Sequence, residues 1–107
     1  MNYFYAHIVD TDNVRNELEL LDMTDDEKNH LLMTVESSMH HVVINTLLTD
    51  LPEEHKQAFM THLAQDDHAN IWEVLKKAFE KPEEKIRDAA AKLKQEFIND
   101  IRELKAL

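Results

Sequence analysis

Apolar residues recur at spacings of three and four throughout residues 24–51, and they do so along several neighbouring rows. One such row forms the apolar face of a helix, and the adjoining rows widen this face between residues 42 and 48. The rows comprise Leu31, Val35, Met39, Val42 and Thr46, then Leu32, Val43, Leu47 and Leu51, and finally Met33, Ile44 and Leu48. A helix that is apolar on most sides is normally buried, so the pattern predicts a long central helix covered on more than one side.

The sequence also marks both ends of this helix. Thr24 and Glu27 have the spacing of a capping box, in which the two side chains satisfy backbone amides of the first turn. The two aspartates between them place negative charge at the positive end of the helix dipole. At the other end Leu51 precedes Pro52, and the residue before a proline is pushed out of the helical region. We therefore expect a central helix over about residues 24–51.

Three shorter helices are predicted around the central one. A cluster of turn-forming residues at positions 10–13 leads into a short helix that buries Val14, Leu18 and Leu21. A second helix begins at Pro52 and runs to about residue 64, and a third follows an aspartate N-cap before residue 71. Their apolar faces carry Ala58, Phe59, His62 and Leu63 in the first case, and Ile71, Trp72, Leu75, Ala78 and Phe79 in the second.

A long C-terminal helix is expected over about residues 82–104. Its apolar stripe is narrow and comprises Ile86, Ala90, Leu93, Phe97, Ile101 and Leu104. A seam of this width can dock onto the central helix or pair with a second copy of the chain. The whole pattern predicts a single all-α domain over residues 1–107, a small irregular or orthogonal bundle of about five helices.

The N-terminal residues have a different composition. Residues 2–9 are rich in aromatic and β-branched types, but no other stretch offers a strand with which they can pair. We therefore expect residues 1–12 to form an extended arm, or an irregular turn packed on the helices, with pairing across a dimer as the alternative. The cluster of Tyr3, Phe4 and Tyr5 belongs to the core if the arm folds back and to an interface if it is exposed. We favour the core.

Composition excludes several classes of protein. The chain has no cysteine, which excludes disulfides and thiolate metal sites and fits a reducing cytoplasm. It has no glycine, on which phosphate-binding loops and nucleophile elbows depend. No apolar run approaches the roughly 18 residues of a membrane span, and the chain does not open with the basic region of a signal peptide. We expect a soluble cytoplasmic protein without a cofactor.

The net charge of −10 lies entirely in the first half of the chain. Residues 1–54 hold 12 acidic and 2 basic residues, whereas residues 55–107 hold 10 of each. Direct binding of nucleic acid or of an anionic membrane is not expected, because phosphate groups need clustered Lys and Arg. The acidic half suits a basic protein partner, although such charge also simply keeps a small protein soluble.

Seven histidines are the one unusual count of functional groups. Three of them stand at helical spacing from a carboxylate, in the pairs Glu27 with His30, Glu36 with His40, and His62 with Asp66. The first pair has the E-x-x-H spacing of di-iron bundles, but the second copy that such a site requires is missing. We interpret the histidines as partly buried groups hydrogen-bonded to their neighbours rather than as metal ligands. No Ser/His/Asp arrangement is present either, so we expect no enzyme.

Three stretches carry a resemblance to other proteins. They are LELLDMTDDEK at residues 18–28, LLTDLPEE at residues 47–54 and FINDI at residues 97–101. In these stretches the chain resembles a family of small uncharacterised all-helical proteins, a domain of unknown function from candidate-phylum bacteria. The resemblance covers about residues 14–104. It implies an all-helical fold and no known activity, so it assigns no functional residue.

These observations predict a non-enzymatic helical module for protein–protein interaction, with a homodimer as an open alternative for the partner. The rival hypothesis is an acidic inhibitor that mimics nucleic acid and blocks a basic enzyme such as a nuclease. The rival requires the carboxylates of the first half to form one continuous surface. The candidate partner-binding residues are Tyr3, Phe4, Tyr5, Asp10, Asp12, Glu17, Glu19, Asp22, Asp25 and Asp26.

Overall fold

A computed structural model describes the backbone of residues 3–106 and the side chains of residues 3–104. Within this part the chain forms five helices and no strand, which confirms the all-α fold. The helices are α1 (Asp12–Glu19), α2 (Asp25–Asp50), α3 (Glu53–Ala64), α4 (His68–Ala78) and α5 (Pro82–Ala106). The predicted bounds agree closely, except that Pro52 is the N-cap of α3 rather than its first helical residue.

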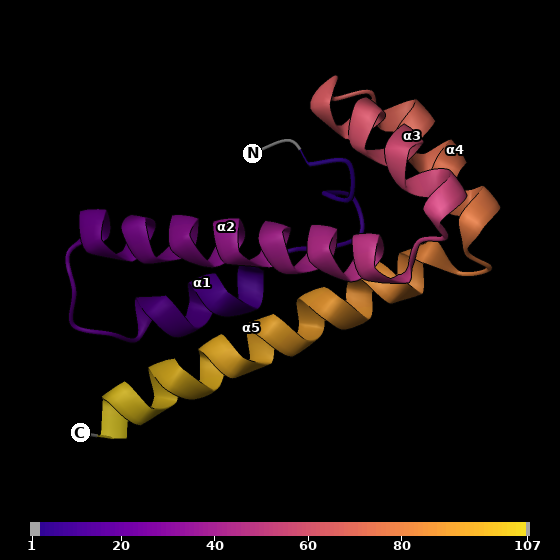
Figure 1. The fold of residues 1–107 in the computed structure, drawn as a ribbon. Coiled ribbons are helices and arrows are strands. Elements are labelled where there is room, and N and C mark those ends of the chain that lie inside the picture. Colours follow the sequence, from indigo (N-terminus) through magenta and orange to yellow (C-terminus); the bar gives the residue numbers. More distant parts are fainter. Residues whose placement is uncertain (1–2, 107) are drawn as a thin grey trace.

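Three of the helices form an elongated body, and the other two extend it at one end. The helices α2 and α5 pack along each other, and α1 fills the wedge between them (Figure 1). The helices α3 and α4 form a hairpin at the end of α2 where α5 begins. The radius of gyration is 15.7 Å, compared with about 13 Å for a compact domain of this length. The hairpin therefore lengthens the molecule instead of covering the side of α2.

Both predicted ends of α2 are found. The Thr24 hydroxyl accepts a hydrogen bond from the Glu27 backbone amide at 3.2 Å and donates to the Glu27 carboxylate at 3.0 Å. Glu27 thus bonds the hydroxyl of Thr24 rather than its backbone amide. At the other end Leu51 is extended, with ψ of 135°, and its amide closes the last turn onto the Leu47 carbonyl.

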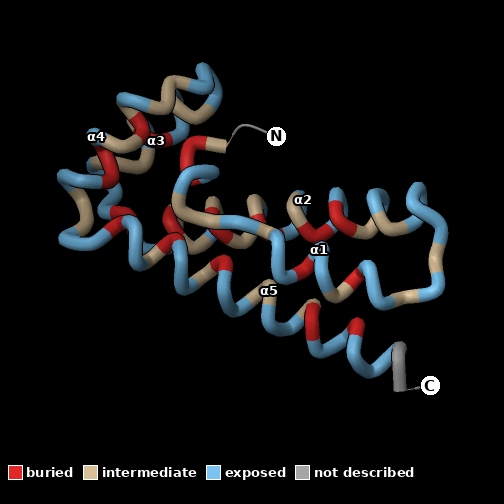
Figure 2. The backbone as a smooth tube through the Cα atoms, turned by 180° about the vertical axis from the view of Figure 1, so that it is seen from behind, coloured by how far each residue is buried: buried red, intermediate tan, exposed pale blue. Residues whose placement is uncertain are grey.

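The core on α2 is narrower than expected. Its buried residues form a single stripe, Leu32, Val35, Met39, Val43 and Leu47 (Figure 2). The residues that flank this stripe are only half-buried, and Met33 is 60% exposed. The half-buried residues are Leu31, Val42, Ile44, Thr46 and Leu48. The prediction of cover on more than one side is therefore wrong for the outer rows. The reason is that α1 is short and the hairpin lies beyond the end of α2, so no described helix covers the side of α2 that carries Met33.

The predicted seam of α5 is confirmed over most of its length. Ile86, Ala90 and Ile101 are buried, and Ile98 joins them. The expectation is wrong for Leu104, which is 59% exposed. Arg102 pairs with Glu17 near the end of α1, so Leu104 lies past the last turn of α5 that α1 can cover.

Residues 3–11, the N-terminal segment, fold back on the helices as irregular turns. Hydrogen bonds from the Ala6 amide to the Tyr3 carbonyl and from the Ile8 amide to the Tyr5 carbonyl, both 3.0 Å long, hold these turns. The segment is not extended, because a lone strand would leave its backbone groups unpaired whereas local turns satisfy them. Phe4 and Tyr5 are 4% and 2% exposed. Both belong to the core, as the favoured interpretation of the aromatic cluster expects.

The stripe on α2 gives a direct test of the fold. Val43 is completely buried, so Val43→Asp should place a carboxylate in the core and lower the free energy of unfolding by roughly 3 kcal/mol or more. Urea denaturation followed by circular dichroism measures this loss. Met33→Asp is the matched control on the same helix and should change stability by less than about 0.5 kcal/mol, because Met33 is exposed. Equal unfolding midpoints for the two variants would contradict the placement of α2.

Candidate partner-binding pocket

The N-terminal segment lies between α2 and the α3–α4 hairpin and contacts both (Figure 1). On one side the ring of Tyr3 stacks on His40 of α2, with centroids 4.0 Å apart and planes 7° apart. The Tyr5 hydroxyl and Nδ1 of the same histidine form a hydrogen bond 2.9 Å long. On the other side the ring of Phe4 meets Phe59 of α3 and Trp72 of α4 edge to face. Consecutive residues of the segment thus join the body to the hairpin.

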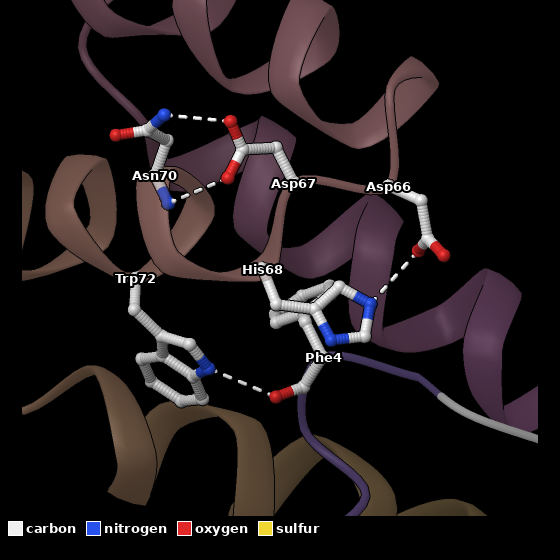
Figure 3. Close-up of polar contacts among 6 residues, drawn as sticks. All are labelled: Phe4, Asp66, Asp67, His68, Asn70 and Trp72. Carbon is white, nitrogen blue, oxygen red and sulfur yellow. Dashed lines mark hydrogen bonds and ion pairs between the residues drawn. The ribbon is translucent and has the colours of Figure 1, made fainter.

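Trp72 provides the polar contact of this junction. Its indole Nε1–H donates to the Phe4 carbonyl at 2.8 Å, as Figure 3 shows. An indole N–H that is removed from water needs a hydrogen-bond partner, and the backbone of the N-terminal segment supplies it here. The pairing satisfies a carbonyl that the turns of the segment leave open.

In the turn between α3 and α4, Asp66 and Asp67 are hydrogen-bonded to His68 and Asn70 (Figure 3). Asp67 caps α4 by accepting from the backbone and side-chain nitrogens of Asn70, and these bonds hold the pKa of Asp67 below its usual value. Asp66 has a left-handed backbone, with φ of 54°, and its carboxylate bonds His68 at 2.8 Å. The expected pair of His62 with Asp66 is therefore replaced. His62 Nδ1 is buried and has no hydrogen-bond partner among the described residues.

A cavity of about 240 Å³ opens where the N-terminal segment, the start of α1 and the middle of α2 meet. We call it the acidic pocket. It is lined by Tyr3, Tyr5, Ala6, Val9, Asp10, Thr11, Asp12, Glu36 and Met39. Four of the residues predicted to bind a partner are among them, namely Tyr3, Tyr5, Asp10 and Asp12.

Carboxylates dominate the polar lining of the acidic pocket. In the described part of the chain, Asp10, Asp12 and Glu36 take part in no ion pair. Glu36 accepts a hydrogen bond from the Thr11 hydroxyl at 3.4 Å, and Lys94 approaches only the backbone carbonyl of Asp10, at 2.9 Å. The pocket therefore presents three carboxylates that make no ion pair among the described residues, with the Lys94 ammonium beside the backbone of Asp10.

The two tyrosines of the pocket stay neutral. Burial raises the pKa of the Tyr5 phenol, and the nearby Tyr3 and Glu36 raise it further. Burial and then Glu36 likewise raise the pKa of Tyr3. Both rings thus remain uncharged at neutral pH, and the neutral Tyr5 hydroxyl is hydrogen-bonded to His40.

Glu36 is the charged residue of the pocket that is not among the predicted partner-binding residues. Its spacing in the sequence indicates a pair with His40 one helical turn later, but His40 is hydrogen-bonded to Tyr5 instead. The available signal is its position beside the buried stripe of α2, directly after Val35 and three residues before Met39. A half-buried glutamate beside a core stripe marks a place where the stripe meets water or a ligand.

The remaining predicted residues lie elsewhere. Phe4 is in the core and offers a partner no surface. Tyr5 lines the pocket but is only 2% exposed, so it offers a partner almost none. Glu17 pairs with Arg102 of α5 at 3.2 Å, and Glu19 pairs with Lys28 of α2 at 3.5 Å. Asp22, Asp25 and Asp26 are exposed around the α1–α2 turn, at the far end of α1 from the pocket. Apart from Glu17 and Glu19, which are paired with cations, the predicted acidic residues thus form one group at the pocket and one at the α1–α2 turn.

The described residues offer neither a metal site nor a membrane-spanning helix. Among the described residues, no group of three or more His, Asp or Glu side chains is placed to hold a metal ion. In the E-x-x-H of α2, Glu27 is engaged in the cap and His30 is exposed. None of the helices in the described part of the chain is long and apolar enough to cross a bilayer.

Comparisons of the chain with protein-family models, with curated proteins and with solved structures find no match. The resemblance to uncharacterised helical proteins stays a prediction. The function of the acidic pocket must therefore be argued from its own residues.

Acid should weaken the docking of the N-terminal segment through His40. Burial lowers the pKa of His40, and the neighbouring His41 lowers it further, so the unfolded chain binds this proton more tightly. The stability linked to His40 is therefore complete above its unfolded pKa of 6.5 and is lost as the pH falls through the folded value. Urea titrations between about pH 7.5 and about pH 5 should show a decline that is shallower in His40→Gln.

His30→Gln is the matched control, since His30 lies exposed on the same helix. It should keep the pH slope of the wild type. An unchanged slope in His40→Gln would mean that His40 is not a buried neutral base.

Proposed function

We propose that this protein is a non-enzymatic helical module that binds a basic protein partner through the face around the acidic pocket. The observation that supports it best is the meeting of Tyr3, Tyr5, Asp10 and Asp12 with Glu36 at one cavity. Residues from three different segments contribute to this face. Its carboxylates have no ion-pair partner in the described part of the chain, whereas Glu17 and Glu19 on α1 have one each.

Charge and side-chain chemistry both suit such a partner. The net charge of −10 lies in the first half of the chain, which supplies every residue of the pocket. Complementary charge accelerates encounter with a basic surface and disfavours acidic competitors. Tyrosine adds rigid contact area at low entropic cost, which explains its enrichment in binding surfaces.

A homodimer through this face is disfavoured, because two copies would bring like charges together. The absence of cysteine agrees with a cytoplasmic module.

The rival hypothesis, an acidic mimic of nucleic acid, is less well supported. A mimic needs a continuous run of carboxylates, as the sugar–phosphate backbone has. Here Glu17 and Glu19, which stand on α1 between the pocket and the α1–α2 turn, are paired with Arg102 and Lys28. An interaction module, in contrast, requires only the carboxylates at the pocket and no continuous acidic surface.

Affinity capture with paired charge variants tests the proposal. The immobilised full chain should recover a basic protein from a lysate of the source organism, and added salt should release it. Asp10→Asn/Asp12→Asn should lower recovery by about fivefold, the effect of two partly exposed charges. Repeated failure to recover any partner would contradict the proposal.

Asp25→Asn/Asp26→Asn is the matched control at the other acidic group. This variant removes the same number of charges by the same substitution at exposed positions of α2. It should bind as the wild type does. Equal loss in both double variants would instead favour the continuous surface of a nucleic-acid mimic.

A further inference from the structure

The size of the acidic pocket limits its occupant. Pockets for drug-sized ligands and cofactors measure about 300–1,000 Å³, whereas this one has about 240 Å³. The pocket is therefore too small for a nucleotide or a flavin. It is large enough for one side chain or one small ion with an organic tail.

The walls divide into an apolar part and a charged part. Half-buried Tyr3 and Val9 supply accessible apolar surface, and Tyr5 and Met39 line the same wall but are almost fully buried. Asp10, Asp12 and Glu36 supply the carboxylates. A ligand that is apolar along its stem and positive at its tip matches both parts, because carboxylates attract the cation and ring faces tolerate it. A bare metal ion would leave the apolar walls unused.

The walls are also fixed before a ligand arrives. Tyr3 is stacked on His40, and the Tyr5 hydroxyl is hydrogen-bonded to the same ring. The Thr11 hydroxyl holds one oxygen of Glu36. Binding to a pocket arranged in this way spends little free energy on ordering side chains.

We propose that the acidic pocket binds one alkylguanidinium or alkylammonium group, carried by an arginine or lysine side chain of a protein partner. The identity of that partner rests on the proposed function, but the recognition of the cation is a property of this chain alone. Glu36 is the central carboxylate, because it is half-buried while Asp10 and Asp12 are exposed. The stem of the cation lies on the apolar walls and its tip between the carboxylates.

Titration of the purified full chain with butylguanidinium chloride and butylammonium chloride, followed by NMR, tests the proposal. The amide signals of Tyr3, Tyr5 and Glu36 should shift and saturate with a Kd on the order of 1 mM, as expected for a single weak cation contact. Butylurea, which is neutral and nearly the same shape, should cause no saturable shift. Equal shifts with butylurea, or with sodium chloride at the same ionic strength, would overturn the proposal.

Matched variants locate the site. Glu36→Gln should weaken binding by roughly fivefold or more, and Asp12→Asn by about twofold. Glu96→Gln makes the same chemical change at an exposed position of α5 outside the pocket and should bind as the wild type does. Circular dichroism and melting curves show that each variant is folded. Unchanged affinity in folded Glu36→Gln would overturn the proposal.

The two proposals fail in different ways. If the small cations do not bind while Asp10→Asn/Asp12→Asn still lowers capture, the cation pocket is wrong and the interaction module stands. If the cations bind at Glu36 but no protein is ever captured, the pocket stands and its partner is not a protein. A free amine would then be the remaining source of the same chemistry.

Discussion

Packing of three consecutive aromatic residues between α2 and the α3–α4 hairpin is the interaction on which the rest of the structure depends. The hairpin sits at the end of the body, and its two helices pack chiefly against each other. Phe4 fills the junction with Phe59 and Trp72, while Tyr3 and Tyr5 turn the other way onto His40. The same few residues therefore hold the hairpin and form the walls of the acidic pocket.

The free energy of this junction is a small difference between larger contributions. Ordering the backbone of residues 3–8 costs about 6–12 kcal/mol. Burial of Phe4 and Tyr5 returns about 3–6 kcal/mol, and the ring contacts and hydrogen bonds add about 1 kcal/mol each. The gains and the cost lie within a few kcal/mol of each other. A ligand in the pocket would add its own binding free energy to this balance, so occupancy and docking of the N-terminal segment are linked.

Local features of the fold could be predicted from the sequence, whereas the extent of cover could not. The ends of α2 depend on Thr24, Glu27 and Pro52, whose effects reach only one turn of helix. The burial of Met33 depends on whether another helix lies over it, and a hydrophobic row does not carry that information. The hairpin instead extends the molecule to 49 Å along its longest axis, and Met33 stays exposed. The lining of the pocket likewise combines residues that are close in the chain with one that only the fold brings near. Tyr3, Tyr5, Asp10 and Asp12 stand close together in the chain, while Glu36 joins them only through the folding of the segment onto α2.

The most direct test of the central claim is a measurement of nuclear Overhauser effects in the wild-type chain near neutral pH. If the N-terminal segment joins the body to the hairpin, ring protons of Tyr3 and Tyr5 will show contacts to His40. Ring protons of Phe4 will show contacts to the indole of Trp72, whose ring centroid lies 5.9 Å away. Absence of both sets of contacts, with sharp signals at random-coil shifts for residues 3–8, would contradict the docked segment and with it the acidic pocket.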